Sequence, residues 1–71
     1  MPLITVNIIE NVFSAKEKAT MITKLTDTMV AIEGEGMRAV TWVKIEEVAE
    51  SHWGIAGTPL TAAMVKDMRK G

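Results

Sequence analysis

Two stretches of the chain have the composition and the apolar pattern of β-strands. The run Leu3–Ile9 is rich in β-branched residues and apolar on both alternating faces, with only Thr5 and Asn7 interposed. Such a run predicts a strand covered on both sides. Residues 39–47 predict a second strand. Its first face carries Thr41, Val43 and Ile45, and its second face carries Val40, Trp42, Lys44 and Glu46.

A long helix is predicted between these two runs. Ser14 and Glu17 have the spacing of a capping box, in which each side chain satisfies a free backbone N–H of the first turn, so the helix should begin at Ala15. Gly34 and Gly36 should end it. The spacing of three and four predicts one apolar face, made of Ala15, Ala19, Ile22, Leu25, Met29 and Ile32.

Strand, helix and strand in this order predict an α/β (α+β) fold with a single βαβ unit, parallel strands and a right-handed crossover. One helix covers only one face of a two-stranded sheet. The other face, with Val40 and Trp42, would meet water unless another subunit covers it. We therefore expect the fold to assemble into an oligomer.

The C-terminal part is predicted to hold a short hairpin and a last helix. Residues 51–57 are punctuated by glycines and indicate a small hairpin or turn. Thr58 and Pro59 resemble the N-cap and first position of a helix. Its apolar face is predicted to be Leu60, Met64 and Met68.

Length and composition support a single domain over residues 1–71 that does not act alone. A domain of this size buries only about 60% of its unfolded surface. Apolar residues make up 48% of the chain, and there is no cysteine. With no disulfide and no zinc-type ligand cluster to supplement so small a core, oligomerisation is the remaining means of stabilisation.

The charge pattern excludes several partner classes. The net charge of −1 gives no basic field for nucleic acid or an anionic membrane. No signal segment or membrane span is recognisable, so a cytoplasmic location is expected. Gly34 and Gly36 follow a helix instead of opening one, so they form no phosphate-binding loop. We expect no metal and no cofactor.

Pro2 directly follows Met1, and removal of Met1 would free a secondary amine. Proline's small side chain at this position normally permits that removal. Burial in an apolar pocket disfavours the protonated amine and lowers its pKa toward neutrality, where a general base works best. In an arbitrary protein, the ordinary interpretation is that proline simply opens a strand, where its missing N–H costs nothing.

Several features together resemble the tautomerase superfamily, in its 4-oxalocrotonate tautomerase-like branch. They are Met1 followed by Pro2, a first strand ending in Ile9 and Glu10, a βαβ unit of this length, and the segment Trp53-Gly54-Ile55-Ala56-Gly57. The resemblance implies a homohexamer built as a trimer of dimers. It also implies a free amino-terminal Pro2 and proton transfer on a small enol or keto acid.

The chain departs from this family at the arginines that commonly bind the substrate. Their positions fall on Val12 and Trp42, whereas the family's later aromatic residue corresponds to Trp53. Without a bidentate clamp, a dianionic substrate should bind poorly, so we expect a substrate of modest charge. Arg38 is the nearest replacement cation, with a solvated loop arginine as the alternative. Trp53 either lines the pocket or anchors the hairpin at a subunit interface, and we expect both roles together.

The resulting hypothesis is a tautomerase with Pro2 as its catalytic base and Arg38, Trp42 and Trp53 as its substrate-binding residues. Two alternatives remain. The same amine could attack a carbonyl and form an iminium. The chain could also be a non-catalytic oligomeric binding or assembly module that kept the fold after losing the arginines.

Overall fold

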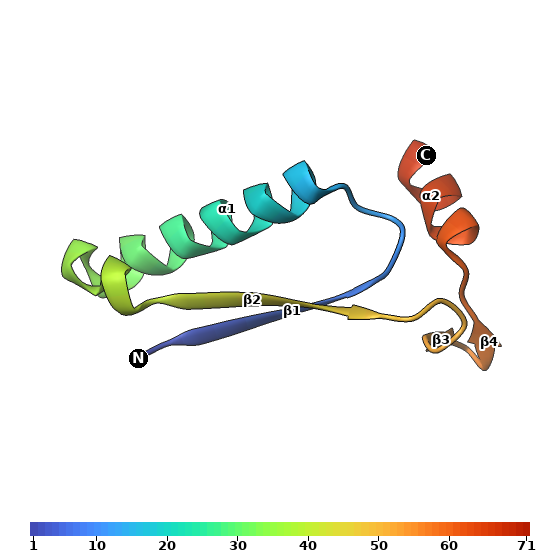
Figure 1. The fold of residues 1–71 in the computed structure, drawn as a ribbon, viewed down its shortest axis with the longest axis horizontal. Coiled ribbons are helices and arrows are strands. Elements are labelled where there is room, and N and C mark those ends of the chain that lie inside the picture. The colour runs from blue at the N-terminus through green and yellow to red at the C-terminus, as the bar shows by residue number, and fades with distance from the viewer.

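The computed structural model describes residues 1–71 and contains four strands and three helical segments (Figure 1). In chain order they are β1 (Leu3–Ile9), α1 (Ala15–Glu33), the 3₁₀ helix η1 (Glu35–Val40), β2 (Trp42–Val48), β3 (Gly54–Ile55), β4 (Thr58–Pro59) and α2 (Ala62–Lys70).

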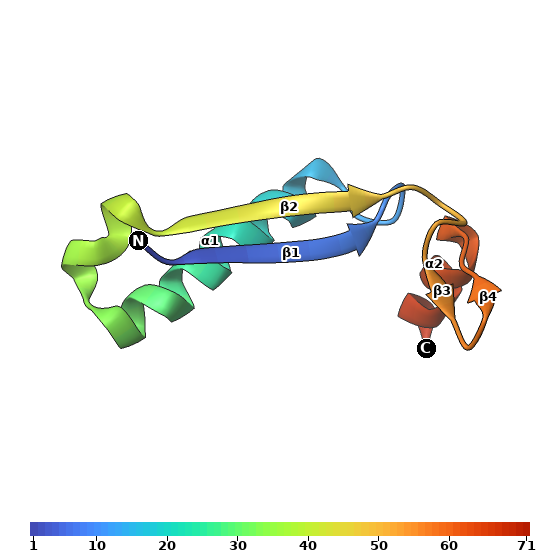
Figure 2. The same cartoon turned by 90° about the horizontal axis from the view of Figure 1, so that it is seen from below.

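The predicted βαβ unit is confirmed. Strands β1 and β2 are parallel and pair from Leu3 opposite Trp42 to Ile9 opposite Val48. Helix α1 lies along one face of this two-stranded ribbon, and no element lies on the other face (Figures 1 and 2). The residues that point away from α1 include two large and exposed apolar side chains, Leu3 at 53% and Trp42 at 58% exposure.

Helix α1 begins as predicted, but its apolar face was only partly predicted. The Ser14 hydroxyl accepts a hydrogen bond from the Glu17 N–H at 3.1 Å, and the Glu17 carboxylate accepts one from the Ser14 N–H at 3.0 Å. Leu25 is half-buried on the packing face. Met29 is half-buried there as predicted. Ala15, Ala19, Ile22 and Ile32 were also expected on this face but are exposed, Ile22 at 41% and Ile32 at 80%. The helix is turned so that Met21 and Val30 are covered as well, because it packs on both β2 and η1.

The second strand begins at Trp42, later than predicted. Gly34 ends α1 with a φ of 108°, a conformation that glycine adopts without strain. The chain then continues into η1, where the Met37 N–H bonds to the Gly34 carbonyl at 3.1 Å. Residues 39–40 belong to this turn, because the chain must return from the end of α1 to the edge of β1 before it can extend.

The prediction that Thr58 and Pro59 open the last helix is wrong. They form β4, which pairs antiparallel with β3. The connecting residues Ala56 and Gly57 both have positive φ, 51° and 81°, as a tight two-residue hairpin turn requires. Pro59 is tolerated because an edge strand does not need its N–H. Thr61 is the N-cap of α2, and its hydroxyl accepts a hydrogen bond from the Met64 N–H at 3.3 Å.

The apolar face predicted for the last helix also changes. Leu60 precedes α2 and is buried at 7% exposure, whereas Met64 is 39% exposed. Together with Ile9, Val12 and Ala62, Leu60 forms a small cluster where the end of β1 meets the C-terminal segment. The helix residues that line the neighbouring pocket are Val65, which is half-buried, and Met68, which is 60% exposed.

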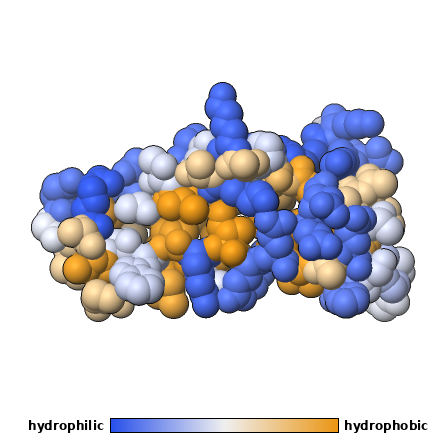
Figure 3. Space-filling model, in the orientation of Figure 1, coloured by the Kyte–Doolittle hydropathy of each residue, from blue (hydrophilic) through white to orange (hydrophobic).

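The molecule is elongated and its core is small. Its principal extents are 43 × 22 × 18 Å and its radius of gyration is 14.7 Å, whereas a compact domain of this length has ~11 Å. Only 5 of 71 residues are buried, and apolar side chains reach the surface in the middle of the space-filling view (Figure 3). No helix combines the length and the apolar composition needed to cross a bilayer.

Candidate active site

Pro2 and Trp42 lie side by side at one end of the ribbon. The Trp42 N–H donates a hydrogen bond to the Pro2 carbonyl at 3.0 Å. Pro2 is half-buried at the entrance to β1. The indole of Trp42 stands on the ribbon face that α1 leaves open, beside Leu3 in the strand register. The two residues are therefore neighbours at this end of the ribbon.

Arg38 lies near this end of the ribbon, in η1, but its guanidinium is already bound by two carboxylates. Its Nε and Nη2 donate to both Glu35 oxygens at 2.7 and 3.3 Å, and its Nη1 donates to Asp27 at 2.7 Å. The hydrogen bonds that Arg38 donates to Glu35 and Asp27 raise the pKa of Arg38 above its usual value, and Arg38 in turn lowers the pKa of Glu35. The positive charge is thus balanced within the chain.

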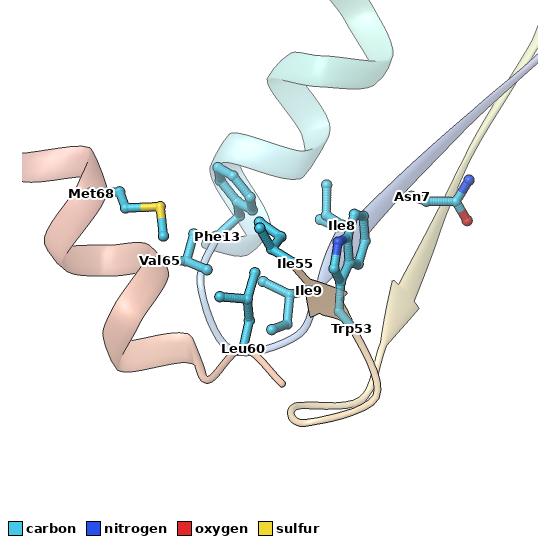
Figure 4. Close-up of a pocket in the computed structure, with 9 residues that line it drawn as sticks. All are labelled: Asn7, Ile8, Ile9, Phe13, Trp53, Ile55, Leu60, Val65 and Met68. Carbon is cyan, nitrogen blue, oxygen red and sulfur yellow. The ribbon is translucent and has the colours of Figure 1, made fainter. Parts of the chain in front are cut away.

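Trp53 lies in an apolar pocket at the other end of the ribbon. The pocket has a volume of about 260 Å³ and nine lining residues, of which eight are hydrophobic. Figure 4 shows Trp53 beside Ile8, with Val65 and Met68 reaching in from α2. The remaining lining residues are Asn7, Ile9, Phe13, Ile55 and Leu60.

Pro2 and Trp53 do not meet within one chain. Pro2 precedes β1 and Trp53 follows β2, at opposite ends of two parallel strands (Figures 1 and 2). Six residues of extended chain from Pro2 to Ile8 in the pocket wall correspond to ~20 Å. A site that uses both residues must therefore combine Pro2 of one copy with Trp53 of another.

The two positions expected to carry arginines have different environments. Val12 is 7% exposed and belongs to the cluster at the C-terminal segment, whereas Trp42 is 58% exposed. A guanidinium nevertheless lies next to Val12. Arg69 of α2 donates from Nη1 to the Val12 carbonyl at 3.3 Å, pairs with Glu17, and stacks on the Phe13 ring at 4.7 Å.

Sequence reasoning missed the contribution of α2 to the pocket. Neither Val65 nor Arg69 was predicted to take part in a site. The contact between Arg69 and Val12 joins residues 57 positions apart, so no local spacing could have indicated it. Met68 was predicted on the apolar face of the last helix, although the start of that helix was placed three residues too early.

Comparisons with known proteins place these features in a family. The sequence model described as "Tautomerase enzyme" matches residues 2–63. A protein of Ralstonia nicotianae described as a "Probable tautomerase" is 44% identical over 63 residues, which cover 89% of this chain and 87% of that protein. The crystal structure of an apo, unfused 4-OT superposes with a TM-score of 0.72 at 25% identity. The superposition covers 90% of this chain and 98% of the 4-OT chain.

The match begins at Pro2 and extends through β1, α1, β2 and the hairpin, which are the elements that position Pro2, Trp42 and Trp53. Most of α2 lies beyond it. The chain belongs to the tautomerase enzyme family, with a 4-OT-like fold.

Proposed function

We propose that the protein is a tautomerase that moves a proton between carbon and oxygen of an enol or keto acid, with the amine of Pro2 as general base. The observation that carries the proposal is the family match, which begins at Pro2, the residue directly behind Met1. Removal of Met1 converts an amide nitrogen that cannot accept a proton into a basic secondary amine. Apolar surroundings then lower its pKa toward the working pH.

The substrate should carry a single carboxylate. The two positions that would clamp a second one hold a buried Val12 and an exposed Trp42. Neither can make the charge-assisted bidentate bonds that a dianion needs. We propose Arg38 as the residue that orients the carboxylate. To do so, Arg38 has to break its ion pair with Glu35 or Asp27 and bind the substrate carboxylate instead.

The active form should be a homohexamer arranged as a trimer of dimers. Three observations support an assembly: the uncovered ribbon face, the elongated shape, and the separation of Pro2 from Trp53. Packing a second copy on the open face covers Leu3 and Trp42. It also excludes water around Pro2, which favours the neutral amine.

The test compares turnover of phenylenolpyruvate by the wild type and by Pro2→Ala, in preparations whose intact mass shows that Met1 is absent. General-base catalysis by the amine predicts a loss of at least about 100-fold in kcat/KM. Equal rates above the rate in buffer would refute a specific role of the Pro2 amine, and wild-type turnover no faster than in buffer would favour the alternative of a non-catalytic assembly module. The loss of both arginine positions is the observation that keeps this alternative open.

A further inference from the structure

The pocket around Trp53 has a chemical character that restricts what it can hold. None of its nine lining residues is charged, and Asn7 is the one polar member. An ionised carboxylate placed there would lose its water without gaining a partner, which is costly. The pocket therefore suits the apolar part of a ligand and not its acid group.

The volume of this pocket also indicates that it holds only part of a ligand. Complete ligand sites usually enclose about 300–1,000 Å³, whereas this pocket has about 260 Å³. A cavity of about 150 Å³ lined by Leu, Ile and Phe is sufficient to bind benzene. The volume thus accommodates one ring or a branched alkyl group, with the rest of the molecule outside.

One wall of the pocket is supplied by a helix that is held in place at both of its ends. At its start, the Glu50 carboxylate accepts a hydrogen bond from the Ala62 N–H at 2.7 Å and another from Asn11 at 2.9 Å. At its end, Arg69 pairs with Glu17 and bonds to the Val12 carbonyl. These contacts present the side chains of Val65 and Met68 to the pocket without further ordering, which favours binding.

We propose that this pocket binds the apolar tail of the substrate, an aryl or branched alkyl group on an enol or keto acid, and that α2 sets this preference. The inference rests on the proposed function, because the reacting carbon of the same molecule lies at Pro2 of a neighbouring copy. Residues 64–70 of α2 lie outside the family match. The α2 part of the lining, Val65 and Met68, is therefore not covered by the family match, whereas the other seven lining residues are.

The test uses a substitution on α2 that fills the pocket. Met68→Trp places a larger ring on the wall. Met64→Trp places the same ring on the same helix outside the lining residues and serves as the matched control. Phenylpyruvate and 2-oxobutanoate share the reacting group and differ in their tails. Exchange of the proton next to the carbonyl for deuterium, followed by NMR, gives kcat/KM for each acid.

After division by the exchange rate of each acid in buffer, the wild type should prefer phenylpyruvate over 2-oxobutanoate by at least about tenfold, since even one methylene in an apolar pocket changes discrimination by about 10- to 200-fold. Met68→Trp should lower this ratio at least about tenfold, and Met64→Trp should leave it unchanged. Ile55→Trp fills the same pocket from the hairpin and replaces Met68→Trp if that variant does not fold. An unchanged ratio in a folded filling variant would overturn the proposal.

Two further measurements separate this inference from its alternatives. Binding of 3-phenylpropanoate, which has the tail but no reacting carbonyl, is followed by ligand-observed NMR. Binding weakened at least about tenfold by Met68→Trp would support the tail pocket. If neither acid is turned over but this weakening is observed, the proposed function is refuted and the tail pocket is retained. A native mass showing that Met68→Trp breaks the oligomer, with an unchanged ratio, would instead assign the pocket to contact between copies and overturn the inference.

Discussion

The backbone N–H of Trp42 donates a hydrogen bond to the carbonyl of Pro2 at 3.0 Å, which holds Pro2, directly before β1, next to the first residue of β2. The indole is 58% exposed and points away from α1. A side chain at position 42 can therefore be exchanged without disturbing the core of the single chain, and it remains next to the candidate base.

Trp42→Arg should move the specificity toward dicarboxylates. A guanidinium beside Pro2 adds a charge-assisted hydrogen bond worth about 1.5–3 kcal/mol. We expect kcat/KM for the enol of 4-oxalocrotonate to rise at least about tenfold relative to phenylenolpyruvate. Steady-state kinetics with both substrates measures this ratio. Trp42→Leu is the control, and an equal gain in that variant would show that loss of the indole, and not the new charge, is responsible.

Val12→Arg should have a different outcome, although the sequence presented positions 12 and 42 as equivalent departures. Val12 is 7% exposed in the cluster with Leu60 and Ala62, and its carbonyl is occupied by Arg69. A second guanidinium there is desolvated beside a like charge, so we expect a loss of at least about 3 kcal/mol in the free energy of unfolding.

Urea unfolding followed by circular dichroism, at fixed protein concentration, measures this loss. Val12→Ala is the matched control. It removes two methyl-sized groups and should cost about 1.5–3 kcal/mol. A Val12→Arg variant that is as stable as the wild type and gains dicarboxylate turnover would contradict the structure of this cluster.

The ion pair of Glu17 and Arg69 should make stability depend on pH in the acid range. The hydrogen bond from Arg69, supported by that from the Ser14 backbone, lowers the pKa of Glu17 from 4.5 to about 2. Because the folded state has the lower pKa, this contribution is complete above about pH 5 and is lost as the pH falls from 4.5 toward 2.

Thermal unfolding of the wild type and of Glu17→Gln at several pH values tests this dependence. The difference in Tm should be constant between pH 5.5 and 8 and should shrink steadily below pH 4.5. Ser14→Ala removes the hydroxyl cap of α1 without removing the carboxylate, and its Tm deficit should change less over the same range. A difference between wild type and Glu17→Gln that does not depend on pH would contradict the pairing with Arg69.

The fold could be predicted where local chemistry decides the structure. The capping box of Ser14 and Glu17 gave the start of α1, and the apolar run at Leu3–Ile9 gave β1. The prediction failed where contacts between residues far apart in the sequence decide the local structure. Thr58 and Pro59 are residue types that commonly start a helix, but in the structure they pair with β3 instead.

The candidate site was predictable to a similar degree. Parallel pairing of the strands is sufficient to bring Trp42 next to Pro2. The pocket wall at Met68 and the contact of Arg69 with Val12 depend on how α2 packs against the end of β1, and no spacing in the sequence encodes that packing.

The most direct test of the central claim is the pKa of the Pro2 nitrogen, followed by ¹⁵N NMR in the intact oligomer and in the free peptide Pro-Leu-Ile-Thr. Our account predicts a titrating amine whose pKa is lowered from that of the peptide toward neutrality, because burial disfavours its charged form. An amine that titrates like the peptide, or a nitrogen still in an amide bond to Met1, would contradict catalysis by Pro2.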